Sequence, residues 1–439
     1  MEYYKRQLED ALLGYLNDRQ LHKNVLILAG ARQVGKTTLI EQITQKKPVL
    51  LLHLEKEPSI AEHIDRCENF QAFEDYLKEV HRYHPEKQIL VIDEAQTSRK
   101  LGSFVRFMKE DWEYANVIIT GSLVSEIYQE TSRTPVGRET HLELWPMSFK
   151  EYLFALEQNS LVKALEEYHP LQSFSAEKHE RLLEHFNRYL VVGGLPEVVR
   201  YALHGKDFQK IRADIYKSYE DDFIRYYSIE EVNLFKRSME AVASNVGSPS
   251  KDSQVIRLDA PGYKKVASIF ARLEKWKLII KCEQLGIEPE KNKFHPKRYL
   301  YDVGILGDLR LKGLPFIGLD ELHSPMLRTP LGGLIENHVA LSLKIQFNDN
   351  LFGLRLSSRA EIDFAVKFNH QVYPVECKLS PKLKNNFLIG LKTFESKMGL
   401  KGFRGFLLFG GMPKKIDDPK VLVLPYYFAD EIKRLLERF

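Results

Sequence analysis

The sequence is poor in cysteine and has no long apolar run, and both absences exclude classes of protein. The three cysteines, Cys67, Cys282 and Cys377, lie far apart and are odd in number, so we expect neither a disulfide framework nor a paired-cysteine zinc site. The longest apolar stretches have strand length, well short of the roughly 18 residues of a membrane-spanning helix. The N-terminal residues, MEYYKRQLED, lack the apolar core of a signal peptide. These features predict a cytoplasmic protein without a membrane segment.

Positive charge is concentrated in two stretches of this 439-residue chain, which is long enough for about three domains. Residues 251–312 contain 14 Lys or Arg against 8 Asp or Glu, and residues 364–439 contain 14 against 7. Because the whole chain carries only +4, the remainder is acidic, at −9. The basic stretches favour contact with a polyanion such as DNA, and solvated helix faces are the alternative interpretation.

A phosphate-binding loop directly follows a short apolar run and is the strongest motif in the sequence. Val25–Ala29 is typical of a strand buried on both faces, and the next residues match GxxxxGK[ST] before an expected helix. Gly30 and Gly35 let successive N–H groups face phosphate oxygens. Lys36 is expected to reach the β- and γ-phosphates, and the Thr37 hydroxyl to ligate Mg²⁺. The motif predicts an ATP site made of Gly30, Ala31, Arg32, Gln33, Val34, Gly35, Lys36, Thr37 and Thr38.

Two further apolar strands end in polar residues that fit the same chemistry. The strand at 88–92 ends in Asp93 and Glu94. Asp93 is expected to hold the Mg²⁺ of the triphosphate, and Glu94 to polarise the attacking water as a general base. The strand that starts at Val117 leads into Thr120-Gly-Ser122, and either hydroxyl would lie beside the γ-phosphate.

In this order and spacing the three strand–loop units resemble those of the AAA+ ATPases. In particular, the chain looks like the prokaryotic (archaeal and bacterial) group with a Gly-x-Arg-Gln-x-Gly-Lys-Thr loop and an appended domain, whose pattern residues 137–153 and 193–199 also fit. The resemblance implies a five-stranded parallel sheet, a helical lid and ATP hydrolysis between subunits of a homo-oligomer, a hexameric ring by family analogy. It also implies an arginine finger, for which Arg138 is the candidate and Arg133 a competitor, while Arg200 is a candidate lid sensor.

The stretch 225–310 is expected to be a small helical module. Helices are expected over Val232–Ala243 and 263–276, followed by a strand at Leu278–Cys282. This order suggests a winged helix, which can place a helix in the major groove of DNA but is as often a protein-contact module. The resembled group's Lys-x-Tyr-x-x-Asp-x-Gly pattern comes next, at Lys297, Tyr299, Asp302 and Gly304.

A second group of acidic residues stands in the C-terminal part. Asp363 interrupts the apolar trend of an alternating strand, and Glu376 and Lys378 of the next strand project from one face. Two such carboxylates can hold Mg²⁺ or Mn²⁺, and a nearby lysine can orient water or offset phosphate charge. Glu336, at the start of an apolar-faced helix, could complete the cluster. Exposed ion pairs on a hairpin are the alternative interpretation.

Over roughly 330–430 this pattern resembles the PD-(D/E)xK nucleases, especially the archaeal Holliday-junction resolvases, although Ile362 stands in place of the proline. The resemblance implies a catalytic set of Glu336, Asp363, Glu376 and Lys378, with metal at Asp363 and Glu376. We predict an α/β protein with four parts: a P-loop AAA+ parallel-sheet core at 1–150, a helical lid at 151–224, a winged-helix-like domain at 225–310 and a restriction-endonuclease-like domain at 311–439.

The predicted function is Mg-ATP hydrolysis that drives an action on DNA, branched DNA by analogy, with cleavage by the C-terminal domain. The alternative is an ATP-dependent switch that acts on a protein partner through a C-terminal domain that does not cleave.

Overall fold

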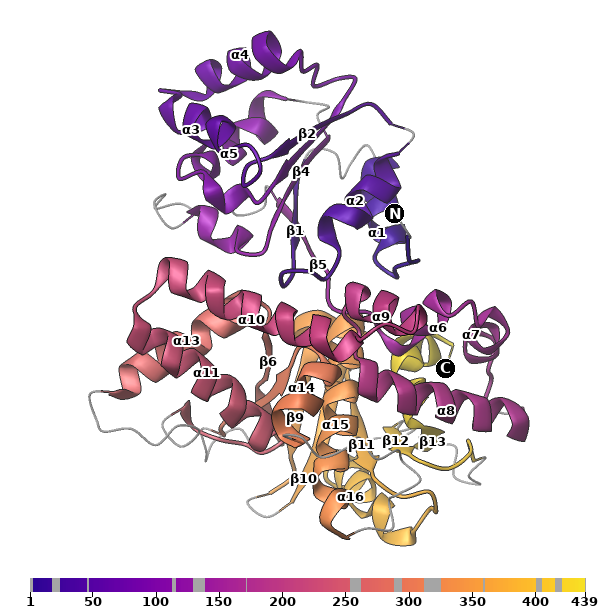
Figure 1. The fold of residues 1–439 in the computed structure, drawn as a ribbon. Coiled ribbons are helices and arrows are strands. Elements are labelled where there is room, and N and C mark those ends of the chain that lie inside the picture. Colours follow the sequence, from indigo (N-terminus) through magenta and orange to yellow (C-terminus); the bar gives the residue numbers. More distant parts are fainter. Residues whose placement is uncertain are drawn as a thin grey trace. The chain divides into compact units, whose positions relative to one another are not determined.

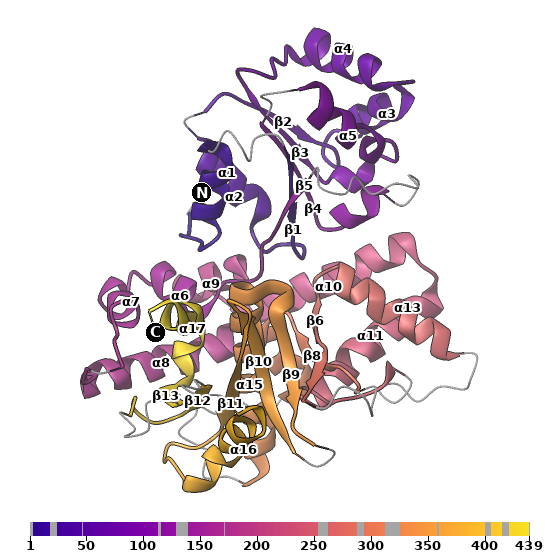
Figure 2. The same cartoon turned by 180° about the vertical axis from the view of Figure 1, so that it is seen from behind.

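The chain divides after Trp145 into a first unit, Met1–Trp145, and a second unit, Pro146–Phe439 (Figures 1 and 2). The structure is a computed structural model. It describes residues 3–17, 24–45, 47–112, 116–128, 139–170, 172–252, 262–287, 294–311, 325–357, 360–399, 405–414 and 421–438. Over these residues, no helix combines the length and the apolar character that crossing a membrane would require.

A parallel five-stranded sheet in the order β2-β3-β4-β1-β5 forms the centre of the first unit. Its strands are β1 (Val25–Ala29), β2 (Val49–His53), β3 (Ile89–Asp93), β4 (Asn116–Gly121) and β5 (Glu139–Glu143). The apolar runs of β1, β3 and β4 are buried because helices cover both faces of the sheet. The predicted parallel sheet is therefore confirmed, and β4 separates the P-loop strand β1 from the acidic strand β3.

Helices lie on both sides of this sheet. Both views show α1 (Glu9–Asn17) and α2 (Lys36–Thr44) on one face, and α3 (Pro58–Arg66), α4 (Phe70–His81) and α5 (Leu101–Asp111) on the other. The core under α3–α5 includes stacked Phe73 and Phe104, whose ring centroids are 5.0 Å apart. Two short 3-10 turns, η2 (Ala95–Thr97) and η3 (Val124–Tyr128), follow β3 and β4. The packing on both faces fixes the strand ends at which the polar residues emerge.

The second unit begins with a run of helices. They are α6 (Phe149–Ala155), α7 (Asn159–Glu166), α8 (Ala176–Val192), α9 (Pro196–Leu203), α10 (Phe208–Tyr226), α11 (Ile229–Ser244) and α13 (Gly262–Lys275). Two begin with capping boxes, in which Ser148 and Ser228 accept from the backbone N–H of Glu151 and Glu231. The predicted helix at 232–243 lies within α11, and the predicted helix at 263–276 matches α13 except for its last residue.

The turn after α8 is bound to a distant acidic residue. Gly193 has φ 84°, and a Cβ there would lie 2.5 Å from Asp302 Oδ1. Asp302 is buried and accepts hydrogen bonds from the N–H groups of Gly194, at 2.7 Å, and Ile305, at 2.9 Å. The Gly-Gly turn and the Lys-x-Tyr-x-x-Asp-x-Gly segment therefore meet, and Asp302 has a structural role there.

The second unit also contains a six-stranded mixed sheet in the order β13-β12-β11-β10-β9-β7. Its strands are β7 (Gln284–Gly286), β9 (Leu351–Arg355), β10 (Glu361–Phe368), β11 (Gln371–Lys378), β12 (Gly405–Phe409) and β13 (Val421–Pro425). Strands β9, β10 and β11 form an antiparallel meander, and α16 (Ile389–Met398) leads from β11 to the parallel strand β12. Asn369 and His370, which join β10 to β11, both have positive φ, as a two-residue hairpin turn requires.

Two helices cover this sheet. Leu391 and Phe394 of α16 pack with Leu407 and Phe409 of β12, so the alternate residues of β12 point to the opposite face, which α15 (Pro325–Phe347) contacts. A separate antiparallel pair consists of β6 (Ile279–Cys282) and β8 (Lys297–Leu300), and α14 (Val303–Leu311) follows β8. Because β7 pairs with β9, the segment 225–310 contributes a strand to the C-terminal sheet.

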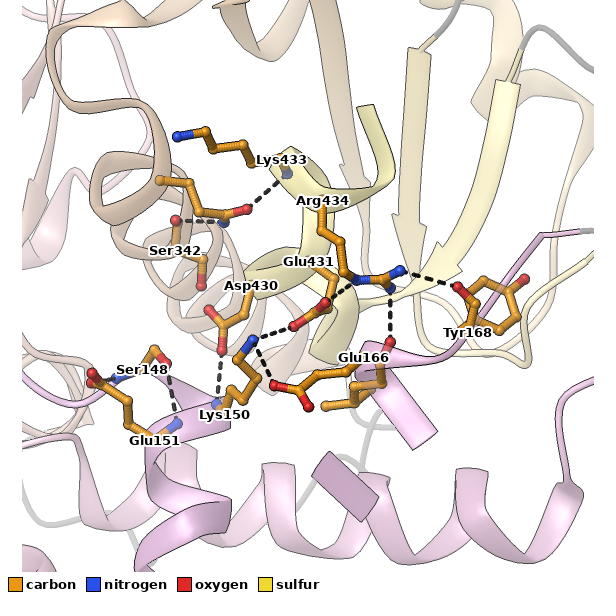
Figure 3. A network of polar contacts seen from close by, with 12 residues as sticks. Ser148, Lys150, Glu151, Glu166, Tyr168, Ser342, Asp430, Glu431, Lys433 and Arg434 are labelled. Atoms are coloured by element: carbon orange, nitrogen blue, oxygen red, sulfur yellow. Dashed lines mark hydrogen bonds and ion pairs between the residues drawn. The ribbon is translucent and has the colours of Figure 1, made fainter. Parts of the chain in front are cut away.

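The end of the chain is tied to the start of the second unit by a buried ion network (Figure 3). The Lys150 ammonium of α6 lies 2.8 Å from Glu431 Oε1 and 3.5 Å from Glu166 Oε1 of α7. The Lys150 N–H donates to Asp430 Oδ2 at 2.8 Å, and Arg434 also pairs with Glu431. Asp430 and Glu431 belong to η7 (Tyr426–Glu431), and Arg434 to α17 (Ile432–Glu437). Since both acidic side chains are buried, their stability depends on these partners.

Replacing Lys150 tests the strength of this network. We expect Lys150→Met to lower the free energy of unfolding by about 2–3 kcal/mol, because Glu431 would stay buried with one cation instead of two. Urea unfolding of the full chain measures the effect. Lys163→Met is the control, since its pair with Glu167 is exposed and should change stability by less than about 0.5 kcal/mol. Equal effects of the two substitutions would contradict the assignment.

Candidate functional site

The loop between β1 and α2 has the curled backbone that the motif predicts. Gln33 and Gly35 have φ values of 62° and 93°, in the left-handed region. Gly30 is packed so closely that a Cβ would lie 2.4 Å from the Leu144 carbonyl oxygen. The Lys36 ammonium donates to the carbonyls of Gly30 and Ala31, both at 2.9 Å, so the lysine lies across the loop. The loop is thus preformed around a buried cation.

Arg6 holds the far side of this loop in place. This buried guanidinium donates to the Val34 carbonyl at 2.8 Å and to the Trp145 carbonyl at 2.6 Å. In the loop itself, Arg32 lies 3.6 Å from Glu55, the second residue after β2. Thr38 is half-buried in the first turn of α2. No local pattern in the sequence pointed to Arg6 or Glu55, because both are distant from the loop along the chain.

The predicted magnesium ligands are adjacent. The Thr37 hydroxyl donates to Asp93 Oδ2 at 2.6 Å, although the two residues come from α2 and from the end of β3. Asp93 is buried, and its other oxygen accepts from the Glu94 N–H at 2.9 Å. His53, at the end of the neighbouring β2, has Nε2 at 3.8 Å from Asp93 Oδ2. A hydroxyl and a carboxylate in contact beside a phosphate-binding loop can complete the coordination of a triphosphate-bound Mg²⁺.

Glu94 is oriented by two polar neighbours. Its backbone has φ 52°, and Oε2 accepts from the Gln96 amide at 2.7 Å and from the N–H and hydroxyl of Ser122, both at 3.4 Å. Thr120 is fully buried, and its hydroxyl donates to the Leu28 carbonyl at 2.9 Å. Of the two hydroxyls considered in the sequence, Ser122 therefore lies beside the acidic pair, and Thr120 bonds within the sheet. No motif in the sequence predicts this contact of Gln96.

Burial changes the proton affinity of the loop lysine. The pKa of Lys36 is lowered to about 8, chiefly because its ammonium is desolvated, while Glu94 and Asp93 partly offset this effect and Arg32 adds to it. The Lys36 ammonium therefore loses its proton more readily than an ordinary lysine does. A negatively charged group bound beside it would raise its pKa again.

The arginine candidates are placed only in part. Arg138 and Arg133 lie outside the described residues. Arg200 is on α9, where its guanidinium lies 2.8 Å from Glu197, and both side chains are partly exposed.

In the second unit, four acidic residues form a carboxylate cluster: Glu336 of α15, Glu361 and Asp363 of β10, and Glu376 of β11. The Asp363 N–H donates to Glu376 Oε2 at 3.2 Å, and the Cys377 N–H donates to Asp363 Oδ2 at 2.8 Å. The Glu336 carboxylate accepts from the Tyr299 hydroxyl at 2.8 Å. The structure therefore brings together the three carboxylates named from the sequence, Glu336, Asp363 and Glu376.

Three cations neutralise most of this cluster. Lys378 pairs with Glu376, as its position two residues along β11 predicts. Arg355 of β9 lies 3.2 Å from Glu361. The Lys297 ammonium of β8 lies 3.5 Å from Glu336, 3.7 Å from Glu361 and 3.9 Å from Asp363. In the sequence Lys297 is part of the Lys-x-Tyr-x-x-Asp-x-Gly pattern, and nothing in that pattern predicts a contact with the acidic residues.

The carboxylates repel one another where they are buried. The pKa of Glu376 is raised to about 7, chiefly by burial and next by the charge of Asp363, while Lys378 and the Asp363 N–H lower it in part. The pKa of Glu336 is raised by the same two causes. Burial works to lower the pKa of Lys297, but Glu336, Asp363 and Glu361 outweigh it and the pKa is raised. In the described part of the chain, no three or more His, Cys, Asp or Glu side chains converge as a metal site does.

Three segments of the chain match families of known sequences. Residues 22–153 match the family described as an AAA domain, residues 183–316 a domain of unknown function (DUF8612), and residues 331–427 a domain of unknown function (DUF4143). The first match agrees with the geometry of the P-loop and the acidic strand. The first unit therefore contains an AAA-type P-loop ATPase domain.

The relatives that match this chain over longer stretches have low sequence identity to it. Two uncharacterized proteins of Methanocaldococcus jannaschii, MJ1544 and MJ1637, are 24% and 22% identical to this chain over 48% and 61% of its length. The matches cover 44% and 59% of those proteins, so the chain spans about half the length of each. The solved Walker-type ATPase PABY2304 of Pyrococcus abyssi is 16% identical, with a TM-score of 0.42 over 70% of this chain and 96% of that one.

The lowered pKa of Lys36 predicts that nucleotide binding takes up a proton in alkaline solution. Above pH about 8 the free protein holds Lys36 largely neutral, and phosphate oxygens should restore the ammonium. We expect an uptake of about 0.9 proton per nucleotide at pH 9 and about 0.1 at pH 7, with affinity falling as pH rises above 8. Calorimetric titration with ADP in buffers of different ionisation enthalpy measures this.

The matched variant for this experiment is Lys36→Arg. Its guanidinium stays charged at pH 9, so binding should proceed without proton uptake. Equal uptake at pH 7 and pH 9 by the unaltered protein would show that Lys36 keeps its ordinary pKa in the loop.

Proposed function

We propose that the first unit hydrolyses ATP and that the second unit binds DNA and cleaves it with the help of a divalent metal ion. The contact of the Thr37 hydroxyl with Asp93 at 2.6 Å, next to Glu94, carries the first half of this proposal. The convergence of Asp363, Glu376 and Lys378 supports the second half.

In the ATPase site each residue has a task that its position suits. The loop N–H groups and the Lys36 ammonium would bind the phosphates, with the lysine leaving the carbonyls of Gly30 and Ala31. Thr37 and Asp93 would hold Mg²⁺, which supplies charge neutralisation at the phosphates. Glu94 would accept the proton of the attacking water, and Gln96 and Ser122 would orient its carboxylate.

In ATPase sites of this class, an arginine from outside the P-loop and the acidic strand stabilises the negative charge of the transition state. Arg138 is proposed to fill this role from a neighbouring subunit, with Arg133 as the competing candidate, in a homo-oligomer that family analogy makes a hexameric ring. The helices from α6 to α10 are proposed as the lid, with Arg200 as a lid sensor.

The topology of the second unit supports a nuclease-like domain. Helix α15, strand β9 and the hairpin of β10 and β11 follow one another, and this helix, strand and hairpin arrangement is the one that resembles the PD-(D/E)xK nucleases. Asp363 and Glu376 fit Mg²⁺ or Mn²⁺, since the charge of Asp363 helps to raise the pKa of the buried Glu376 carboxyl, and Mg²⁺ needs only one or two protein carboxylates. The metal would supply charge stabilisation at a scissile phosphate. Lys378 would orient the attacking water beside it.

DNA contact is proposed for the basic second half of the chain. Helix α13, proposed as the recognition helix of a winged-helix-like domain, presents exposed Lys264 and Lys275. Its Lys265 and Arg272 pair with Glu230 and Glu231 of α11, at 2.8 and 2.6 Å. The exposed Lys264 and Lys275 suit phosphate contacts, whereas Lys265 and Arg272 would have to exchange partners to reach DNA.

A specific observation favours the second candidate function, an ATP-dependent switch without cleavage. Every acidic residue of the carboxylate cluster already has an internal cation as a partner: Lys297 for Glu336 and Asp363, Arg355 for Glu361, and Lys378 for Glu376. A cluster satisfied in this way can be kept for packing and contact with a partner protein.

Turnover of ATP by Glu94→Gln tests the first half of the proposal. We expect the rate of hydrolysis to fall by about 10²-fold or more, because the amide cannot take the proton of water, while ATP affinity changes by less than about threefold. Lys36→Ala should lose nucleotide binding. Glu62→Gln, at an exposed carboxylate of α3, is the control and should hydrolyse ATP at the original rate. Unchanged turnover in Glu94→Gln would remove that residue from the role of base.

Cleavage of a labelled branched duplex with Mg²⁺ or Mn²⁺ tests the second half. We expect the unaltered protein to release shorter products and Lys378→Ala to lose them while still binding DNA, in a manner that weakens steeply with salt. Lys392→Ala, at an exposed lysine of α16, should cleave normally. Identical products from the unaltered protein and Lys378→Ala would end the nuclease proposal, and binding without cleavage by both would favour the switch.

A further inference from the structure

Lys297 is a buried cation that enters the carboxylate cluster from outside the sheet that carries the proposed metal ligands. Its residue is 1% exposed, and it belongs to β8, which pairs with β6 and not with β9, β10 or β11. Its ammonium lies within 4 Å of three carboxylates and 3.4 Å from the Asp363 carbonyl oxygen. A lysine this deeply buried is stable only with such compensation.

The position of Lys297 is fixed by neighbours on the same strand and on α15. Asn337, next to Glu336, accepts from the Leu300 N–H at 2.7 Å and donates to the Leu300 carbonyl at 2.9 Å. This pair of bonds sets β8 against α15, so that Lys297 and Tyr299 both reach Glu336. The ammonium is therefore held at one place in the cluster, unlike a flexible surface lysine.

Glu336 is enclosed on both sides. Its Oε1 accepts from Tyr299 and faces Lys297, and a Cβ on Gly247 would lie 2.4 Å from Oε2. Both carboxylate oxygens thus already have close neighbours. Asp363 and Glu376, by contrast, are joined to each other through the Asp363 N–H and share the face that carries Lys378.

We propose that Lys297 is a built-in cation of the carboxylate cluster, which competes with divalent metal at Asp363 and keeps Glu336 out of the metal's coordination. This inference rests on the proposed metal site at Asp363 and Glu376. A divalent ion on Asp363 would lie a few ångströms from the ammonium, and two positive charges at that separation in a buried place repel strongly. Lys297 is a positioning residue that sets metal affinity and does not itself touch the reacting atoms.

Binding of Mn²⁺ to the full chain, followed by electron paramagnetic resonance, tests this role. We expect Lys297→Met to bind Mn²⁺ at least about tenfold more tightly than the unaltered protein, because the competing charge is gone. Lys281→Met is the matched control: it lies on the partner strand β6 and pairs with Glu283, away from the cluster, and it should leave the affinity unchanged. The double variant Lys297→Met with Asp363→Asn should lose this increase in Mn²⁺ affinity. That loss would show that the ion is bound at Asp363.

The failures of the two proposals can be told apart. If the unaltered protein binds Mn²⁺ through Asp363 and Lys297→Met binds it no more tightly, the role of Lys297 is wrong and the metal site stands. If Asp363→Asn removes no bound Mn²⁺ from either the unaltered protein or Lys297→Met, both proposals fall together.

A second pair of variants covers the case in which Lys297→Met does not fold. The double substitution Lys297→Met with Glu336→Gln removes one charge of each sign and so keeps the cluster balanced. It should bind Mn²⁺ at least about tenfold more tightly than Glu336→Gln alone. Equal affinities of these two variants would overturn the proposal.

Discussion

A charged group that is buried away from water has to be paired, and this constraint shapes both units of the chain. In the first unit, β3 carries Asp93 into the interior, where the Thr37 hydroxyl and the Glu94 N–H satisfy its oxygens. In the second unit, α15, β10 and β11 bring acidic side chains together, and cations from three different strands form ion pairs with them. What each site can bind depends on which of these internal hydrogen bonds and ion pairs a ligand can replace.

The two sites differ in how easily their partners can be exchanged. Lys36 donates to loop carbonyls, which are neutral, and phosphate oxygens are stronger partners for an ammonium. The ATPase site can therefore gain by binding its ligand. The carboxylate cluster already holds full positive charges, so an incoming metal ion must compete with an ion pair rather than with a hydrogen bond.

Local patterns predicted the parts of the structure that depend on neighbours in the chain. The strand Val25–Ala29 has the predicted bounds, since an apolar run before a glycine loop leaves little choice. The same-face spacing of Glu376 and Lys378 also predicted their ion pair. Such patterns could not predict contacts between residues that lie far apart in the sequence. Lys297 could not be matched to Asp363 without knowing that β8 and β10 approach the same helix, and Arg6 could not be matched to Val34.

The segment from Lys297 to Asp302 connects two such distant partners within the second unit. At one end Asp302 binds the Gly194 N–H after α8, and at the other Lys297 lies among the carboxylates. Alternate side chains of β8 lie on opposite faces, so Lys297 and Tyr299 both point to Glu336. Asn337 forms two hydrogen bonds with the backbone of Leu300 in the same strand. A shift of the turn at Gly193 and Gly194 would therefore act on β8 through Asp302. Because a buried ion pair depends strongly on distance, even a small displacement of β8 would change how firmly Lys297 occupies the cluster.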